Sequence, residues 1–361
     1  MRSNDNFCII LAGGIGSRLW PSSRQQKPKQ FLDFMGTGET LLQATYRRFA
    51  AFINPENIIV MSNHMYESYI HEQLPNLSPR NLLLEPMRRN TVPSVTWGCV
   101  EIAHRNPNAR VVVAPSDQVV VTHEEFEKEI LTGLDYVARH ERLLTLGVVP
   151  YRPDTTYGYI QMADERETDI FEVRAFTEKP TLEFAQMFVE SNEFLWNTGL
   201  FIWKAKTYLS SMHRQSDLFV EMMEEVEKKY TEGESVGGLV ADSFAKCPNV
   251  SLEQGVLEKL ENVDVMMCHF KWSDIGTWHA LYDVMDKTED SNVRIGKHAL
   301  LYDCENCLVK LPSGKVAVVQ GLKDYIVVEE NDVLVICKKD DQNAIRKFVN
   351  DVQINVGDEF V

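Results

Sequence analysis

Short apolar runs alternate with segments of helical periodicity through the first half of the chain, and this alternation restricts the fold more than any other feature. The apolar runs, each of a length that suits one buried strand, are Phe7–Ala12, Asn57–Met61, Leu82–Leu84, Arg110–Ala114 and Leu143–Val149. The helical patterns between them are Thr40–Ile53, Val92–His104 and Glu124–His140. Strands that alternate with helices predict a Rossmann-like α/β fold, in which a mostly parallel sheet is flanked by helices.

The middle of the chain mixes the two kinds of element. The predicted strands are Tyr157–Met162, Ile170–Thr177, Trp196–Trp203 and Val263–Cys268. The predicted helices are Leu182–Glu190, Ala205–Met212 and Leu218–Tyr230, and Thr231–Gly238 is expected to be a polar loop.

The composition changes at Asp286–Asn292, a charged stretch with little helical pattern. Beyond it, Val- and Ile-rich runs recur about every eight to ten residues, which is typical of a small all-β module. These runs are Ala299–Tyr302, Cys307–Leu311, Lys315–Gln320, Tyr325–Glu329 and Val333–Lys338, followed by a predicted helix at Asp341–Val352. We therefore expect an α/β domain over residues 1–288 and a β-rich module over residues 289–361, for which a β-helix is one candidate form.

The charge and the cysteines narrow the class of protein. A formal net charge of −16 disfavours a broad nucleic-acid or anionic-membrane surface, and no apolar run approaches the ~20 residues of a membrane helix. Seven scattered cysteines suit a reducing compartment, and the pair Cys304 and Cys307 lacks the second pair of a zinc site. We expect a cytoplasmic protein that binds neither nucleic acid nor membrane.

A glycine-rich turn follows the first predicted strand, within Leu11–Pro21. Glycines in such a turn let backbone N–H groups approach a phosphate closely, although a purely structural turn is the simpler alternative. Arg18 and Lys29 bring two cations to the same stretch, and an arginine can hold a polyphosphate bidentately. Pro21 would interrupt the helix that a dinucleotide-binding loop enters, which disfavours that class. The loop residues expected to bind substrate are Leu11, Ala12, Gly13, Gly14 and Gly16.

The stretch Leu11–Phe31 resembles the signature of sugar-nucleotide pyrophosphorylases, which have the nucleotidyltransferase fold. Its Arg-Leu-Trp-Pro and Pro-Lys-Gln-Phe sequences are similar to the mannose-1-phosphate guanylyltransferase branch. Further segments match this family in the expected order: Glu85–Thr91, Pro115–Asp117, Tyr157–Ile160, Phe176–Pro180, Trp196–Gly199 and Trp272–Trp278. The resemblance covers nearly the whole chain.

Two aspartates are expected to hold Mg²⁺. Asp117 follows an apolar strand, where ligands gather in open α/β sheets, and Asp274 lies between two tryptophans. A lone aspartate after a strand is more often a helix cap. The resemblance reverses this preference, since both positions correspond to the family's metal-binding aspartates. Gln118 stands where the family usually has His, so the resemblance implies the metal ligand at Asp117 but not the orienting role of that His.

The resemblance also implies a sugar-phosphate site. Lys179 would hold the phosphate of the sugar, while Glu178, Asn197 and Gly158 would contact its hydroxyls. From the sequence alone, an exposed lysine at a strand end is the simpler interpretation of Lys179.

The segment around Glu85 is expected to contact the base or ribose of the nucleotide. A carboxylate can accept hydrogen bonds from N1–H and the exocyclic amine of guanine, a pattern that adenine and uracil do not offer. Arg89 and Asn90 complete the segment, but Asn90 or Thr91 could equally cap the following helix.

Together these features predict the transfer of GMP from GTP to mannose 1-phosphate. The same chemistry on a heptose or glucose 1-phosphate and a catalytically silent regulatory subunit remain open alternatives. An NAD-dependent dehydrogenase is disfavoured because Asp33, at about the distance of a ribose-binding acid, follows no strand-like run. Whether the chain forms a homo-oligomer is left open.

Overall fold

The computed structural model describes residues 2–232, 237–339 and 344–361, without the side chains of residues 215–218. The chain forms two compact units, neither of which is continuous in sequence. The first unit comprises Met1–Gly13, Tyr46–Pro115 and Val120–Trp272, and the second comprises Gly14–Thr45, Ser116–Val119 and Ser273–Val361.

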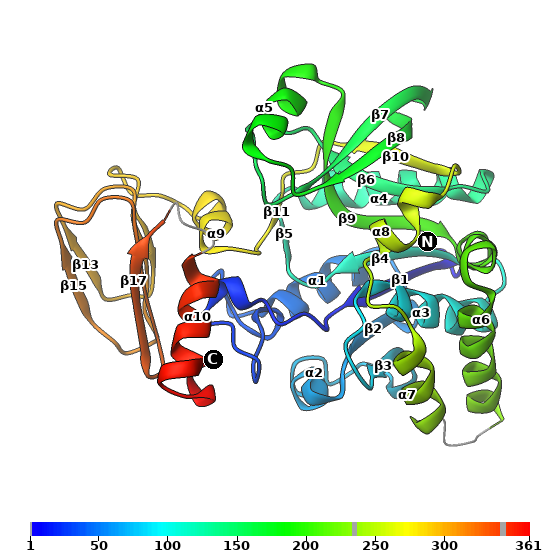
Figure 1. Cartoon of the computed structure of the whole chain (residues 1–361), viewed down its shortest axis with the longest axis horizontal. Helices are drawn as coiled ribbons and strands as arrows, with labels where there is room; N and C mark the ends of the chain where they lie inside the picture. Colours follow the sequence, from blue (N-terminus) through cyan, green and yellow to red (C-terminus); the bar gives the residue numbers. More distant parts are fainter. Residues whose placement is uncertain (1, 233–236, 340–343) are drawn as a thin grey trace. The chain divides into compact units, whose positions relative to one another are not determined.

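A nine-stranded sheet forms the centre of the first unit, in the order β3-β2-β1-β4-β9-β6-β10-β8-β7 (Figure 1). Its strands are β1 (Asn6–Leu11), β2 (Ile58–Asn63), β3 (Leu82–Glu85), β4 (Arg110–Pro115), β6 (Leu143–Val148), β7 (Gly158–Glu167), β8 (Ile170–Glu178), β9 (Phe194–Lys204) and β10 (Val263–Cys268). The neighbouring strands β3, β2, β1 and β4 pair in parallel, and so do β6 and β10. β9 runs antiparallel to β4 and β6, and β8 and β7 add further antiparallel pairs. The predicted α/β fold is confirmed, with a sheet that is mixed because β9 enters between two parallel groups.

Helices lie on both faces of this sheet. They are α2 (Glu67–Gln73), α3 (Thr91–Arg105), α4 (His123–Arg139), α5 (Leu182–Ser191), α6 (Ala205–Thr231), α7 (Gly237–Lys246) and α8 (Leu252–Gly255). On one face, Ile9, Ile59 and Val113 pack in one core with Trp97 of α3 and Phe244 of α7. On the other face, α4 contacts β4, β6 and β9.

Two helical predictions in this unit need correction. The helices predicted at Ala205–Met212 and Leu218–Tyr230 are one continuous helix, α6. The residues between the two predicted helices, 213–217, are helical as well. Of the loop predicted at Thr231–Gly238, residues 233–236 lie outside the described residues, while Thr231 ends α6 and Gly237 begins α7.

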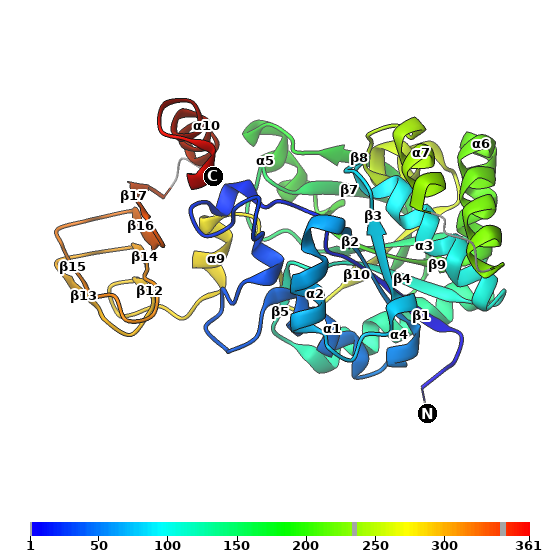
Figure 2. The same cartoon turned by 90° about the horizontal axis from the view of Figure 1, so that it is seen from below.

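The second unit contains the β-rich end of the chain. Its strands β12 (Val293–Ile295), β14 (Leu308–Lys310), β16 (Tyr325–Glu330) and β17 (Val333–Lys338) form one sheet, and β13 (Ala299–Tyr302) and β15 (Ala317–Gln320) form another. Successive strands within each sheet pair in parallel until β17, which turns back antiparallel, so the chain winds as a short β-helix (Figure 2). The predicted strands are confirmed, and β12 is an addition. The predicted helix at Asp341–Val352 corresponds to α10 (Ala344–Asn355), while residues 341–343 lie outside the described residues.

The early segment Gly14–Thr45 shares a core with this β-helix. Leu19, Trp20 and Phe34 pack with Trp278 of α9 (Trp278–Val284) and with Val335 of β17. The indole of Trp20 donates a hydrogen bond to the carbonyl of Phe360 over 2.8 Å. The remaining elements are α1 (Leu41–Ala50), β5 (Gln118–Val120) and β11 (Trp272–Asp274), and β5 pairs with β11. Among the described residues, no helix combines the length and the apolar composition that crossing a membrane requires.

Candidate functional site

Two hydrogen bonds to the backbone of Ala12 hold the start of the glycine-rich turn at the end of β1. The N–H of Ala12 donates to the carbonyl of Met61 over 2.8 Å, and the hydroxyl of Ser62 donates to the carbonyl of Ala12 over 2.8 Å. Both contacts belong to the end of β2, which therefore fixes where the turn begins. Beyond it, the carbonyl of Gly14 accepts a hydrogen bond from the side-chain amide of Gln30 over 2.9 Å.

Gly16 occupies a position that only glycine fits. Its φ is +67°, a left-handed conformation that an L side chain adopts only at a cost, and it begins the 3₁₀ turn Ser17–Leu19. A Cβ at this position would lie 2.8 Å from Cγ of Lys29 and 2.9 Å from Oγ of Ser23. The same Ser23 hydroxyl accepts from the N–H of Lys29 over 2.9 Å. The turn and Lys29 are therefore packed directly against each other.

Lys29 extends from this contact to two carboxylates. Its Nζ lies 2.7 Å from Oδ2 of Asp117 and 3.7 Å from Oδ1 of Asp274, and it donates to the carbonyl of Ile275 over 2.9 Å. Burial alone would lower the pKa of Lys29, but the two neighbouring carboxylates outweigh it and raise that pKa. The ammonium therefore stays charged at neutral pH.

Arg18 completes the cluster at Gly276. A Cβ on Gly276 would lie 3.0 Å from Oδ2 of Asp274 and 3.1 Å from Nη2 of Arg18, so all three groups meet there. Burial and the charge of Asp117 raise the pKa of Asp274, while Lys29 and Arg18 oppose that rise. Two cations and two anions from three distant segments thus meet within the second unit, and the carboxylates keep 25% and 32% of their side-chain surface exposed to a ligand.

The donor set of Asp117 and Asp274 fits a hard divalent cation. Both carboxylates lie within 4 Å of one cation, the ammonium of Lys29, at 2.7 and 3.7 Å, so they face a common point. In the described part of the chain, no group of three or more His, Cys, Asp or Glu side chains could hold a metal. Mg²⁺ suits such a pair because it is commonly bound by one or two carboxylates together with water and substrate phosphates. Gln118, in place of the family's His, is buried beside Asp117 at the start of β5.

Glu85 lies in the first unit at the end of β3, close to the turn. It is 6% exposed, and a Cβ on Gly13 would lie 3.6 Å from its Oε2. The hydroxyl of Ser94 donates to Oε1, and the guanidinium of Arg88 is nearby. Burial raises the pKa of Glu85 to about 7, against the opposing effects of Ser94 and Arg88. The predicted base-reading carboxylate is therefore a buried group that titrates near neutral pH.

Arg89 and Asn90 have roles within the fold. The guanidinium of Arg89 donates to the carbonyls of Phe244 and Ala245 near the end of α7, over 3.2 and 3.3 Å. Asn90, with φ of +63°, accepts from the N–H of Thr91 over 3.0 Å and caps α3. The capping interpretation of Asn90 is confirmed, and contact with the base or ribose remains a prediction for both residues.

The four residues predicted for the sugar phosphate lie together in the first unit. Gly158 is paired with Glu178 across β7 and β8, and a Cβ on Gly158 would lie 2.8 Å from Oε2 of Glu178 and 3.5 Å from Cβ of Asn197. Lys179 follows with φ of +47°, and its ammonium donates to Oε1 of Glu178. More than half of the Lys179 side chain is exposed, so the ammonium is accessible to a phosphate.

The sequence prediction did not include two polar residues that contact these groups. Ser94 binds Glu85, and Glu253 accepts a hydrogen bond from Nδ2 of Asn197 over 3.1 Å. Glu253 lies 56 residues beyond Asn197 in a segment without a recognised motif, so no signal in the sequence connects the two.

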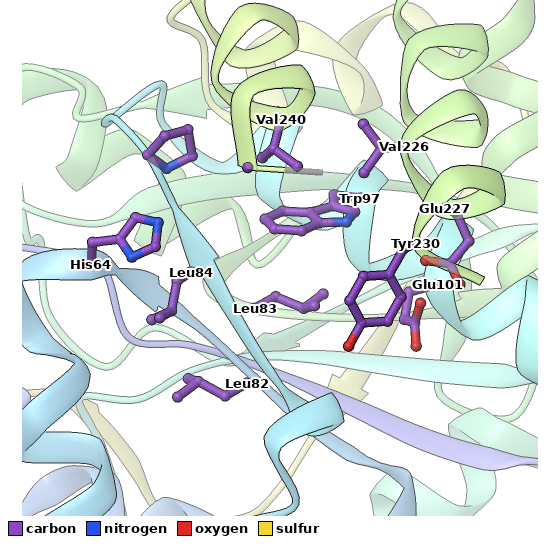
Figure 3. A pocket seen from close by; sticks show the side chains of 12 residues that line it. His64, Leu82, Leu83, Leu84, Trp97, Glu101, Val226, Glu227, Tyr230 and Val240 are labelled. Atoms are coloured by element: carbon purple, nitrogen blue, oxygen red, sulfur yellow. The ribbon is translucent and has the colours of Figure 1, made fainter. Parts of the chain in front are cut away.

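A separate apolar pocket of about 200 Å³ lies on the first unit between β3, α3, α6 and α7. Its walls include Leu82, Leu84 and Trp97, and its polar groups include Glu101 and Tyr230 (Figure 3). None of the residues predicted for the substrate site lines it. Glu85 does not line this pocket, and its carboxylate lies beside Gly13 instead.

A mixed sheet, a glycine turn and clustered cations are together typical of α/β proteins that bind phosphate groups. Comparison with known protein families supports this class. The Nucleotidyl transferase family matches residues 7–291, and the MannoseP isomerase/GMP-like beta-helix domain matches residues 297–352.

Individual relatives match along most of their length. The mannose-1-phosphate guanylyltransferase of Salmonella montevideo is 34% identical over 96% of this chain and 74% of its own. Alginate biosynthesis protein AlgA of Pseudomonas aeruginosa is 33% identical over 95% of this chain and 71% of its own. A solved structure described as a mannose-1-phosphate geranyltransferase from Thermus thermophilus superposes with a TM-score of 0.85 at 30% identity, covering 97% of this chain and 99% of that one. The chain belongs to the nucleotidyl transferase family and, within it, to the mannose-1-phosphate guanylyltransferases.

Proposed function

We propose that this protein transfers GMP from GTP to mannose 1-phosphate, giving GDP-mannose and pyrophosphate. The observation that carries the proposal is the meeting of Arg18, Lys29, Asp117 and Asp274 beside a glycine turn. These residues come from three segments that are far apart in sequence, and a purely structural turn would not need them. Relatives named for this activity at 31–34% identity support the choice of substrates.

The reaction forms one phosphorus–oxygen bond and breaks another. A phosphate oxygen of mannose 1-phosphate attacks the α-phosphorus of GTP, the bond from that phosphorus to the α,β-bridging oxygen breaks, and pyrophosphate leaves with the bonding electrons. The attacking oxygen is already anionic, so no general base is needed. Positioning and neutralisation of charge then account for catalysis.

Arg18 and Lys29 are assigned to the β- and γ-phosphates. The guanidinium of Arg18 can hold phosphate oxygens bidentately, and Lys29 adds a point charge that stays ionised. Asp117 and Asp274 would hold Mg²⁺, which when bound supplies neutralisation of phosphate charge. The backbone N–H groups of the turn, from Leu11 to Gly16, complete the nucleotide side of the site.

Lys179 is assigned to the phosphate of the sugar and Glu178, Asn197 and Gly158 to its hydroxyls. The proposal is supported by their proximity in one place and by the exposure of the Lys179 ammonium. Glu85 is assigned to guanine, with Arg89 and Asn90 nearby.

The proposal extends to organisation and location. Residues 1–288 would form the catalytic domain and residues 289–361 the β-rich module, near the division between the two matching families. A cytoplasmic location is supported by the seven cysteines, among which the described part of the chain forms no disulfide bond. Assembly into a homo-oligomer stays open, and chromatography with light scattering measures it.

The experiment assays the purified protein with each common nucleoside triphosphate against mannose, glucose and heptose 1-phosphates, following pyrophosphate release. GTP with mannose 1-phosphate is expected to give the highest kcat/KM. A higher value with another sugar phosphate would keep the chemistry and change the substrate. Binding of GDP-mannose without any pyrophosphate release would establish the regulatory alternative instead.

A further inference from the structure

The side-chain amide of Asn197 is held at both of its ends. Its Oδ1 accepts a hydrogen bond from the N–H of Gly199 over 3.0 Å, and its Nδ2 donates to Oε1 of Glu253 over 3.1 Å. A backbone N–H can only donate and a carboxylate only accepts, so the two partners allow one orientation of the amide. Removing Glu253 would leave the amide held only by its oxygen.

Gly158 lies between this amide and the carboxylate of Glu178, and its lack of a side chain lets the two groups approach each other. A Cβ at Gly158 would lie 2.8 Å from Oε2 of Glu178 and 3.8 Å from Nδ2 of Asn197. An acceptor and a donor thus come close together beside Gly158. A hydroxyl group matches this arrangement, since it donates one hydrogen bond and accepts another.

Glu253 is itself fixed by the fold. It lies in the first turn of α8, where Ser251 caps the helix by accepting from the N–H of Gln254 over 3.4 Å. The N–H of the neighbouring Leu252 donates to Oγ1 of Thr91 over 2.8 Å, which ties this turn to α3. Burial and the nearby carboxylate of Glu178 raise the pKa of Glu253, while its own backbone N–H, Asn197 and Ser251 oppose that rise.

We infer that Glu253 is a positioning residue for the sugar, which orients the Asn197 amide so that its nitrogen can donate to a substrate group beside Glu178. One sugar hydroxyl then donates to Glu178 and accepts from Asn197. This inference rests on the proposed function, because it takes Glu178 and Asn197 to be part of the sugar site. It adds a specificity determinant that does not touch the substrate.

The test compares Glu253→Ala with Glu253→Gln and with Glu258→Ala, an exposed glutamate five residues further along the chain. Glu253→Ala should raise the KM for mannose 1-phosphate about tenfold, because loss of one hydrogen bond of ordinary strength changes affinity by about this factor. The kcat and the KM for GTP should change less than twofold. Glu253→Gln keeps an acceptor oxygen and should stay within about threefold of wild type, and Glu258→Ala should match wild type. Thermal melting checks that each variant is folded; if Glu253→Ala is not, Glu253→Leu carries the same expectation.

The decisive readout uses the 2-, 3- and 4-deoxy analogues of mannose 1-phosphate. Wild type should lose about tenfold in kcat/KM with one of them, and Glu253→Ala should show no further loss with that same analogue. A folded Glu253→Ala that equals Glu258→Ala, or that is affected equally by all three deletions, overturns the inference. Wild type without activity toward mannose 1-phosphate refutes the proposed function instead, and activity with another sugar phosphate moves the same comparison to the deoxy forms of that sugar.

Discussion

Gly16→Ala is expected to damage both the stability of the second unit and the catalytic cluster. Forcing an L side chain into the left-handed conformation costs about 1–2 kcal/mol. The new Cβ would also lie within 2.9 Å of Lys29 and Ser23, and overpacking of this kind adds about 1–3 kcal/mol. We therefore expect the free energy of unfolding to fall by about 2–5 kcal/mol.

The same change should displace Lys29 from Asp117, to which its ammonium lies 2.7 Å away. A misplacement of about 1 Å at a catalytic group can cost ~10² in rate, so kcat/KM for GTP should fall about 100-fold. Urea unfolding followed by tryptophan fluorescence measures the first effect, and pyrophosphate release measures the second.

Gly36→Ala is the matched control. Gly36 has the same φ of +67°, but a Cβ there would meet nothing within 4 Å. Gly36→Ala should therefore cost about 1–2 kcal/mol in stability and leave kcat/KM unchanged. If Gly16→Ala and Gly36→Ala prove equal in both stability and activity, the contact between the turn and Lys29 has no energetic importance and the reasoning fails.

Four further predictions concern the carboxylate pair, Glu85 and the β-helix. Asp117→Asn and Asp274→Asn should each keep the fold and lower turnover by ~10²–10³, and near-normal turnover in either with Mg²⁺ present would contradict a shared metal site. Glu85→Gln should lower the ratio of kcat/KM for GTP over ATP, whereas an unchanged ratio would make Glu85 structural. Because burial raises the folded-state pKa of Glu85 from 4.5 to about 7, the native state holds a proton there that the unfolded state has released. Its contribution to stability should therefore be lost as pH rises from about 4.5 to 7, and a wild-type unfolding free energy that does not fall relative to Glu85→Gln over this range would contradict that pKa. A chain ending at Asp290 should lose GTP binding, because Trp20 and its neighbours lose their apolar partners; retained affinity in a folded protein would show that the turn does not depend on the β-helix.

Much of the fold was predictable because its signals are local. The strands of the β-rich module, such as Ala299–Tyr302 and Val333–Lys338, begin and end where their patterns indicate. The glycine turn after β1 was equally visible. In each case the residues that determine the element lie within it, so periodicity and turn chemistry are sufficient.

The long-range packing was not predictable in the same way. The β-helix lies far from the segment Gly14–Thr45 in sequence. Trp20 and Phe34 of that segment nevertheless share a core with Val335, more than 300 residues away. The hydrophobic effect has no direction and does not select a particular partner. An apolar residue in a loop therefore does not reveal which distant strand covers it. Polar networks have the same limitation, since Glu253 contacts Asn197 only after both segments have folded.

The meeting of the site residues could be predicted in part. The position of Asp117 after a strand indicated where ligands gather, and the family resemblance supplied Asp274 and Lys29. What the sequence did not contain was their arrangement, in which Lys29 lies between the two carboxylates and Gly276 leaves room for Arg18.

The fate of labelled GTP tests the central claim most directly. The purified protein is incubated with mannose 1-phosphate, Mg²⁺ and GTP labelled at either the α- or the γ-phosphorus, and the products are separated by chromatography. The account predicts that the α-label appears in GDP-mannose and the γ-label in pyrophosphate, in equal amounts. A γ-label that appears as free orthophosphate or on the sugar would mean that the bond to the γ-phosphorus is broken, and would contradict nucleotidyl transfer at this site.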